Sequence, residues 1–266
     1  MTPREIIGLV PAAGQATRIS PLPFSKELYP IGLRSTRDGR GARPQAVACY
    51  LLERMRFAGV RKAFIVLRDG KWDIPGYFND GTELLNMHLA YLMMRLPFGP
   101  PFSLDQAYEF VRDALIVFGF PDILFSPQDV FVRLIEHQLQ SNADVVLGVF
   151  PCDRPDTDDM IEFDDASRVR AIHIRQPVAA TRLQYAWFVA TWAPSFTQFM
   201  HEYLAAALAA DHAVATRREW HVGHVIQAAI EQGLHVNAVP FPDARYLDIG
   251  TPESLARLYQ TVLDVT

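Results

Sequence analysis

A short loop near the start of the chain places two cations beside a run of small residues. Pro11-Ala-Ala-Gly-Gln-Ala-Thr-Arg18 follows the apolar run Ile6–Val10, and Lys26 comes eight residues after Arg18. Small side chains allow backbone N–H groups to approach an anion closely. Cations beside such a loop suit a triphosphate, because phosphoryl transfer needs positive charge where negative charge accumulates. The loop lacks the three-glycine spacing of a dinucleotide fingerprint and the Gly-Lys-Ser/Thr of a P-loop, and a plain strand–helix turn is the alternative interpretation.

The elements around this loop alternate between short apolar runs and helical patterns, which is typical of βαβ units. Strands are predicted at Ile6–Val10, Ala63–Leu67, Ala114–Phe118, Ala143–Phe150, Val169–Ile174, Tyr185–Thr191 and His235–Pro240. Helices are predicted at Ala46–Ala58, Glu83–Met94, Leu104–Arg112, Val130–Gln140, Ser195–Ala210, Val222–Gln232 and Pro252–Val265. Leu96–Ser103 is expected to be irregular and Cys152–Asp165 to be an acidic loop. The predicted fold class is α/β, with a doubly wound, mostly parallel, Rossmann-like sheet and a small antiparallel insertion.

The composition narrows the class of partner. The 266 residues include 25 Lys+Arg and 30 Asp+Glu, a net charge of −5, which gives no general attraction to nucleic acid or to an anionic membrane. Two cysteines are too few for a disulfide framework. No apolar run has the length of a signal-peptide core or a spanning helix. We therefore expect a single cytoplasmic domain over residues 1–266 with no membrane partner, and a homo-oligomer is compatible with this composition.

The segment Val10–Ile31 resembles the signature of the sugar-1-phosphate nucleotidylyltransferases. The matching residues are Pro11, Ala12, Gly14, Thr17, Arg18, Pro21, Lys26, Glu27 and Pro30. The opening Pro-Ala-Ala-Gly and the Lys-Glu pair are more similar to the UTP–glucose-1-phosphate branch, and the length to the glucose-1-phosphate thymidylyltransferase branch. Ala13, Ala16 and Ser25 depart from the signature. Because a Cβ disfavours left-handed backbone, Ala16 can take the place of the usual glycine only if its φ is negative.

The resemblance assigns roles to the loop and to two aspartates. It implies that Arg18 and Lys26 are catalytic and that the nucleotide is bound by Ala12, Ala13, Gly14, Gln15 and Thr17. It also implies Mg²⁺ as cofactor, which takes one or two carboxylates together with phosphate oxygens. Asp122, in Gly119-Phe-Pro-Asp, and Asp248, in Tyr246-Leu-Asp-Ile-Gly-Thr-Pro, are the expected metal ligands. The alternative for Asp122, which is displaced by two residues from the family position, is a turn cap.

Matches of lower similarity fall between these segments. Pro101–Ala107 resembles the segment that contacts the nucleobase, which assigns Ser103 and Gln106 to the nucleotide. Arg168–Pro177 resembles the segment that binds the sugar phosphate, which assigns Arg175 and Gln176, the latter in place of a lysine. The resemblance thus divides the chain into a nucleotide-binding half, 1–150, and a sugar-phosphate-binding half, 151–266.

Several other residues have simpler interpretations. His221 and His224 have the spacing of a metal pair on a helix, but no third ligand motif lies nearby. The pairs Asp158-Asp159 and Asp164-Asp165 are predicted to be solvated turns. Trp187 and Trp192 are predicted to pack in the core, with stacking on a sugar ring as the alternative.

The resemblance implies an enzyme that transfers a nucleotidyl group from an NTP, with dTTP or UTP expected, to a sugar 1-phosphate, releasing pyrophosphate. The departures at Ala16, Ser25 and Gln176 and the Gly-Phe-Pro-Asp insertion suggest an alternative, a non-catalytic sugar-nucleotide-binding or regulatory protein. Cytidylyl transfer to a non-sugar phosphate is a further alternative. The sequence specifies neither the base nor the sugar.

Overall fold

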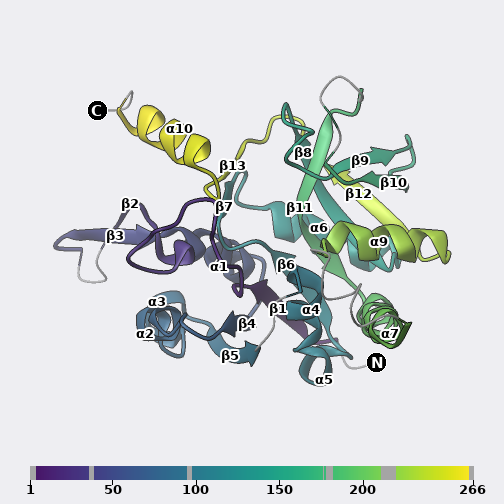
Figure 1. Ribbon diagram of the computed structural model, residues 1–266, viewed down its shortest axis with the longest axis horizontal. Helices are drawn as coiled ribbons and strands as arrows, with labels where there is room; N and C mark the ends of the chain where they lie inside the picture. Colours follow the sequence, from purple (N-terminus) through teal and green to yellow (C-terminus); the bar gives the residue numbers. More distant parts are fainter. Residues whose placement is uncertain are drawn as a thin grey trace.

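The computed structural model describes residues 4–35, 39–94, 98–175, 177, 182–210 and 220–263. Within these residues a nine-stranded sheet forms the centre of the molecule, with helices on both faces (Figure 1). Its parallel part has the order β5 (His88–Met94), β4 (Lys62–Arg68), β1 (Ile6–Pro11) and β6 (Leu115–Gly119). The chain leaves β1 toward β4 on one side and returns to β6 on the other side. The carboxyl end of β1 is therefore a topological switch point, where open α/β sheets bind ligands.

The rest of the sheet is built around one long antiparallel strand, β11 (Tyr185–Trp192). It pairs with β6 and with β8 (Val145–Pro151), and it meets β9 (Met160–Phe163) at one residue. β12 (Val236–Pro240) runs parallel to β8, and β10 (Val169–His173) pairs antiparallel with β9. The mixed α/β architecture with a parallel centre and an antiparallel addition confirms the predicted fold class.

Alternate residues of the central strands face two separate hydrophobic cores. In β6, Ile116 and Phe118 belong to one core, while Leu115 and Val117 belong to the other. The first core is covered by α4 (Pro100–Asp105), α5 (Tyr108–Val111), α7 (Pro194–Ala210) and α9 (Val222–Glu231). The second is covered by α1 (Val47–Phe57), α2 (Asp73–Phe78), α3 (Thr82–Leu85) and α6 (Val130–Ser141). Burial on both faces explains why these strands are almost entirely apolar.

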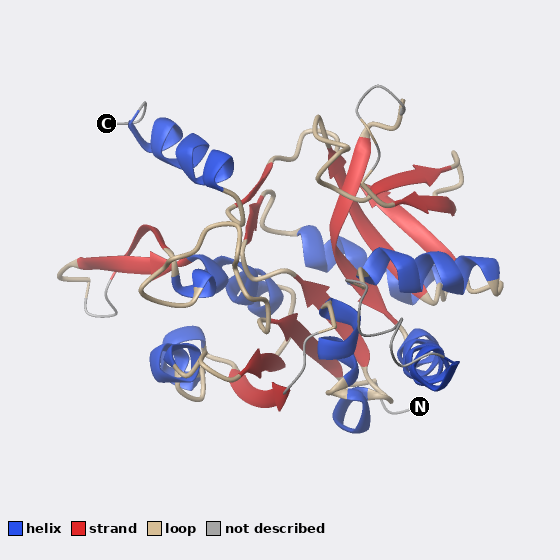
Figure 2. Cartoon of the chain, in the orientation of Figure 1, coloured by secondary structure: helices blue, strands red, loops and turns tan. Residues whose placement is uncertain are grey.

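Two small sheets lie outside this sheet. A hairpin pairs β2 (Pro30–Ser35) with β3 (Ala42–Ala46), and β7 (Ile123–Phe125) pairs antiparallel with β13 (Tyr246–Asp248). Figure 2 shows this hairpin and α10 (Pro252–Leu263) extending from the same side of the molecule. The described helices include none with the length and apolarity needed to cross a bilayer.

Four predictions of secondary structure were wrong. Glu83–Met94 is a short helix, α3, followed by β5, since pairing with β4 overrides the helix-favouring Leu and Met residues. Leu104–Arg112 contains the end of α4 and the whole of α5. Part of the segment predicted to be irregular is helical, because Pro100 occupies the first position of α4, where a missing N–H costs nothing. Cys152–Asp165 contains β9.

Candidate active site

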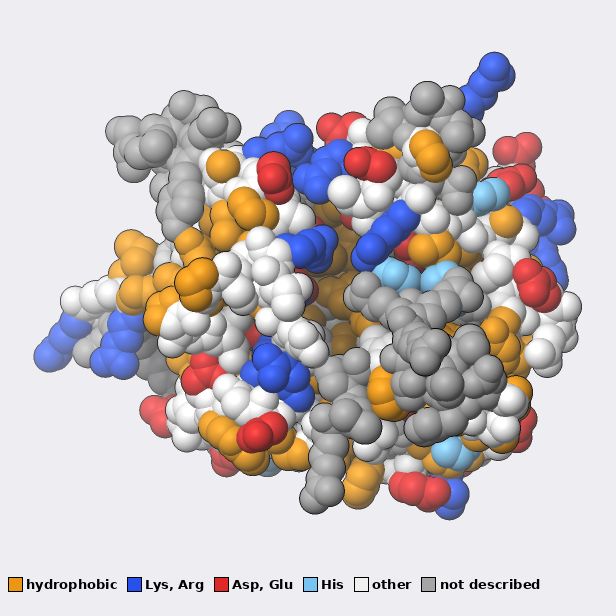
Figure 3. All heavy atoms as spheres, viewed as in Figure 1, with side chains coloured by type: hydrophobic (Ala, Val, Ile, Leu, Met, Phe, Trp, Pro, Cys, Tyr) orange, Lys and Arg blue, Asp and Glu red, His pale blue; other side chains and the backbone are white. Residues whose placement is uncertain are grey.

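The signature loop, the end of β6 and the start of β13 surround a single cavity of about 550 Å³, within the size range of small-molecule sites. Figure 3 shows it as a hollow near the centre of one face, with Lys and Arg side chains at its rim. The predicted site residues that line it are Ala13, Gly14, Gln15, Thr17, Arg18, Lys26, Ser103, Asp122, Arg175 and Asp248. Segments more than two hundred residues apart therefore meet at the switch point of the sheet.

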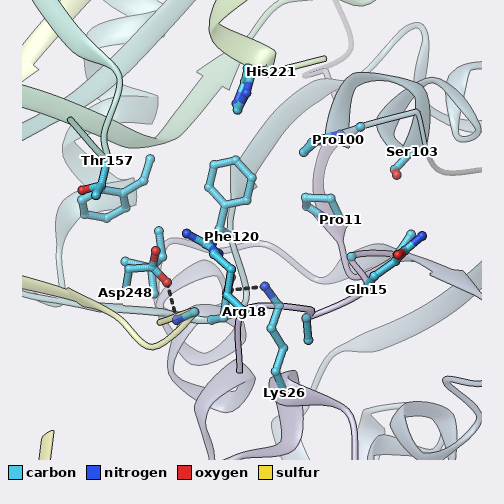
Figure 4. A pocket seen from close by; sticks show the side chains of 18 of the residues that line it. Pro11, Gln15, Arg18, Lys26, Pro100, Ser103, Phe120, Thr157, His221 and Asp248 are labelled. Atoms are coloured by element: carbon cyan, nitrogen blue, oxygen red, sulfur yellow. Dashed lines mark hydrogen bonds and ion pairs between the residues drawn. The ribbon is translucent and has the colours of Figure 1, made fainter. Parts of the chain in front are cut away.

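Lys26 and Asp122 form the closest charged contact in this cavity. Lys26 lies at the start of η1 (Lys26–Leu28), and its Nζ is 2.5 Å from Oδ2 of Asp122 (dashed line in Figure 4). Burial alone would lower the pKa of Lys26, but the charges of Asp122 and Glu27 outweigh it and raise that pKa. Burial would raise the pKa of Asp122, but Lys26 holds it below its ordinary value. Both groups are therefore charged, and an ammonium is held where a phosphate would need it.

Two residues that follow β4, Lys71 and Asp73, hold the chain on either side of Lys26. Asp73 accepts hydrogen bonds from the backbone N–H and the hydroxyl of Ser25, both at 2.6 Å. On the other side Lys71 Nζ lies 2.7 Å from each carboxylate oxygen of Glu27, and both side chains are buried. A proline before the lysine, as in the family signature, has no N–H to donate, so Ser25 allows this contact with Asp73.

Asp248 reaches the cavity through the small sheet of β7 and β13. Asp248 is opposite Ile123 in this pair, and the Ile249 N–H donates to the carbonyl of Asp122 over 3.1 Å. The backbone therefore holds the two aspartates next to each other. Asp248 Oδ1 accepts the Gly250 N–H at 2.7 Å. Burial, followed by the negative charge of Asp122, raises the pKa of Asp248 to about 6.

Gly250 marks the point where the charged groups converge. A Cβ at Gly250 would lie 2.8 Å from Asp248 Oδ1, 3.1 Å from Arg18 Nη2 and 3.4 Å from Asp122 Oδ2. Because Asp248 Oδ1 and Asp122 Oδ2 both lie close to this Cβ position, the two carboxylates are near each other. Figure 4 shows Arg18 between Lys26 and Asp248. A side chain at position 250 would occupy the space between a cation and two acids, and glycine leaves it open.

The donor set of this space fits a magnesium ion that is bound together with a nucleotide. Asp122 and Asp248 offer hard carboxylate oxygens, and the raised pKa of Asp248 indicates that a cation would stabilise its charged form. No cluster of three or more His, Cys, Asp or Glu suited to a metal occurs in the described part of the chain. The protein would therefore supply two ligands, with phosphate oxygens and water as the others.

Ala16 contradicts the expected backbone geometry of the signature loop. Its φ is +55°, in the left-handed region, although it has a Cβ. The condition of a negative φ at this position is therefore not met. The loop therefore keeps a conformation that favours glycine, because its ends are fixed by β1 and by the Lys26 segment, and its strain is about 1–2 kcal/mol.

The residues assigned to the nucleotide do not all reach the cavity. Ser103 lines it but is buried, with its hydroxyl directed at the sulfur of Met94 over 3.0 Å. Gln106 is exposed and does not line the cavity; its amide lies 3.5 Å from the carbonyl of Phe102. Ala12 belongs to a hydrophobic core, and its N–H donates to Val66. The cavity wall near Ser103 is made by Phe98, Gly99 and Pro100.

The far end of the cavity contains residues of the second half of the chain. Arg175 lines it and is exposed, while Gln176 lies outside the described residues. Asp158 and Asp159 line it too, so the prediction that they form a solvated turn was wrong. In the second acidic pair, Asp164-Asp165, Asp164 caps a turn by accepting hydrogen bonds from the N–H groups of Ala166 and Arg168.

The histidines and tryptophans have clear structural positions. His221 and His224 form a capping box at the start of α9, which accounts for their spacing without a metal. Trp192 is fully buried and donates to Thr197, as core packing predicts. Trp187 is also buried but lines the cavity.

Lys71, Asp73 and Asp158 are site residues that the sequence reasoning missed. Lys71 and Asp73 lie just after the second predicted strand, at the same carboxyl edge as the signature loop. Their position at the carboxyl edge of the sheet, where ligands bind in such folds, is the sequence signal that could have identified them as site residues. The bond from the Tyr246 hydroxyl to Asp158, 2.6 Å long, joins residues 88 positions apart and had no counterpart in the sequence pattern.

Comparison with known proteins identifies the fold. No family model matches the sequence, and no protein of curated function matches it. A Bacillus anthracis structure assigned as a glucose-1-phosphate thymidylyltransferase superposes with a TM-score of 0.78 at 15% identity, covering 98% of this chain and 96% of the other. A UDP-glucose pyrophosphorylase in complex with UDP-glucose gives 0.77 at 14%, covering 98% and 100%. The inositol-1-phosphate CTP transferase of T. maritima gives 0.67 at 18%, covering 96% and 93%. The chain therefore has the fold of the sugar-phosphate nucleotidyltransferases over nearly its whole length.

Proposed function

We propose that the protein is a sugar-1-phosphate nucleotidylyltransferase, converting an NTP and a sugar 1-phosphate into an NDP-sugar and pyrophosphate. The observation that carries the proposal is the convergence of Arg18, Lys26, Asp122 and Asp248 in one cavity at the switch point. Solved structures of the same fold are named for nucleotidyl transfer with glucose 1-phosphate and inositol 1-phosphate. Residues 1–150 would form the nucleotide-binding half and residues 151–266 the sugar-phosphate-binding half.

The chemistry requires positioning and charge neutralisation. An oxygen of the sugar phosphate attacks the α-phosphorus, and the bond from that phosphorus to the oxygen bridging to the β-phosphate breaks. The attacking oxygen is already anionic, so the protein supplies no general base and no nucleophile. Lys26 would bind the α-phosphate and Arg18 the departing pyrophosphate. The backbone from Ala13 to Thr17 would face the phosphates, and Arg175 would bind the phosphate of the sugar.

Asp122 and Asp248 would hold Mg²⁺, which when bound neutralises phosphate charge. Lys26 contacts Asp122 in the structure described here. Its ammonium is thus already placed beside the carboxylate that would face the ion. A bound triphosphate offers Lys26 a second anionic partner close to its present position.

The decisive experiment is an assay of pyrophosphate release with Mg²⁺, using dTTP, UTP, CTP and GTP against several sugar 1-phosphates. Lys26→Ala is expected to lower turnover by about 10²–10³-fold, as for other electrostatic stabilisers of a transition state. Lys62→Ala is the matched control, because Lys62 pairs with Glu5 outside the cavity and its loss should leave turnover unchanged.

Two results would contradict the proposal. Nucleotide binding without turnover for every pair would favour the alternative, a non-catalytic sugar-nucleotide-binding protein. A near-normal rate for Lys26→Ala would show that Lys26 does not have the proposed catalytic role, even if the protein is an active enzyme.

A further inference from the structure

Asp159 is a cavity residue whose charge the proposed reaction leaves unused. It lines the cavity and is half-buried, and its Oδ2 packs against Gly223, where a Cβ would lie only 2.6 Å away. Within the described ranges of the chain, no group donates a hydrogen bond to its carboxylate and no cation lies within 4.0 Å of it. Figure 4 shows Thr157, two residues before it, across the cavity from Gln15 of the signature loop.

The neighbouring Asp158 differs in this respect. Its Oδ2 accepts the Tyr246 hydroxyl at 2.6 Å and the Cys152 thiol at 3.3 Å. These contacts connect the loop before β9 to β13 and so to Asp248. Asp158 therefore has a structural role, whereas Asp159 presents an acceptor without a donor.

Trp187 lines the same cavity. Its indole Nε1 has no hydrogen-bond partner among the described residues and is enclosed by the protein, so a ligand in the cavity can contact the ring but not its N–H. The carboxylate of Asp159 is therefore the group that a ligand could satisfy with a donor.

The negative charge of Asp159 determines which kind of hydrogen-bond donor a ligand should offer it. Arg175 is the cation of the described chain that acts electrostatically on Asp159, and it lines the same cavity. If Arg175 binds the substrate phosphate, as proposed above, its charge is shared between that phosphate and Asp159. A buried carboxylate without a compensating charge is costly. A hydroxyl would supply a hydrogen bond but no charge, whereas an ammonium supplies both, and charge-assisted hydrogen bonds are about twice as strong as neutral ones.

We infer that the second substrate carries an ammonium group that binds Asp159, and that it is an amino sugar phosphate. This inference rests on the proposed function and names the substrate class of its sugar site. Aromatic rings of Trp187, Phe188 and Tyr246 line the same cavity and suit a cation.

The test compares glucosamine 1-phosphate, glucose 1-phosphate and N-acetylglucosamine 1-phosphate with the NTP that supports the fastest turnover. The first carries an ammonium where the second has a hydroxyl and the third a neutral amide. In the wild-type protein, kcat/KM for glucosamine 1-phosphate is expected to exceed that for each of the others by about 10-fold or more, as a charged hydrogen bond would give. This comparison needs no variant.

Asp159→Asn then removes the charge and keeps the shape. The ratio of kcat/KM for glucosamine 1-phosphate to that for glucose 1-phosphate should fall to about 1, whatever the absolute rate of the variant. Asp165→Asn, in an exposed turn outside the cavity, is the control and should keep the advantage.

The outcomes separate this inference from the proposed function. Turnover with equal or higher kcat/KM for glucose 1-phosphate overturns the inference and leaves the nucleotidyl transfer intact. An advantage that survives in Asp159→Asn also overturns it. Absence of turnover with every sugar phosphate overturns both.

Discussion

At the scale of single residues, Ala16 has a left-handed backbone conformation that its Cβ disfavours. Replacing it with glycine removes about 1–2 kcal/mol of left-handed strain and adds about 0.5–1 kcal/mol of unfolded-state entropy. Ala16→Gly is therefore expected to raise the free energy of unfolding, by roughly 0.5–1 kcal/mol, measured by urea denaturation.

The control for this substitution is Ala58→Gly. Ala58 follows α1 with φ of −76°, where glycine relieves no strain, so its free energy of unfolding should fall. Equal losses for both variants would show that Ala16 is not strained in solution.

Asp159 gives a second prediction at this scale. Burial raises its pKa to about 7, from an ordinary value of 3.8. Between these two values the folded protein binds more protons than the unfolded chain, so ionisation of Asp159 lowers stability as the pH rises. Asp159→Asn cannot ionise and should be more stable than wild type above pH 7, by on the order of 2 kcal/mol, with no advantage below pH 4.

Urea denaturation of both proteins across this pH range measures the difference. Parallel stability curves would show that Asp159 ionises without penalty. The same measurement with saturating glucosamine 1-phosphate should reduce the advantage of the variant, because only wild type gains the charged contact.

At the scale of elements, the loop between β4 and α2 positions the reactive lysine through a buried ion pair. Removing one member of such a pair leaves an uncompensated charge, which costs about 3–5 kcal/mol. Lys71→Met is therefore expected to destabilise the protein by that amount. The double variant Glu27→Gln/Lys71→Met removes the stranded charge and should recover much of the loss, as a double-mutant cycle of unfolding free energies would show.

Additive effects of the two substitutions would contradict this account of the pair. Turnover of the double variant gives a second measure. It should stay below that of wild type even where stability recovers, because residue 27, next to Lys26, is no longer held by an ion pair with residue 71.

At the scale of the whole molecule, the two proposed halves share one sheet. β11, from the second half, pairs with β6 and β8 of the first half, and both hydrophobic cores contain residues of both halves. Neither half can complete its core alone. The full chain should therefore unfold in a single cooperative transition, with circular dichroism and tryptophan fluorescence giving the same midpoint.

Two separate transitions would show that the halves are independent domains. The tryptophans report on both regions, because Trp72 precedes α2 and Trp192 lies in the central sheet. Variants that keep only one of these tryptophans would show which half unfolds first.

Much of the fold follows from local patterns in the chain. Strands buried on both faces, such as Ala63–Leu67 and Ala114–Phe118, are continuous apolar runs, and their prediction needed no tertiary information. His88–Met94 was missed because its leucines and methionines favour helix, and only pairing with β4 selects a strand. The small sheet of β7 and β13 was missed because each strand has three residues and gains its partner across the whole sequence.

The chemistry of the site was determined by residue types in the sequence: small residues and cations in one loop, and an aspartate after each of two distant apolar segments. Tertiary structure alone decided which groups meet. It placed Asp122 and Asp248 beside Gly250, left Gln106 outside the cavity, and brought Asp159 and Trp187 into it. The physical reason is that periodicity and composition report on burial along one chain segment. The direction in which a loop side chain points depends on hydrogen bonds and charges contributed by distant segments, as Asp73 and Lys71 do for Lys26.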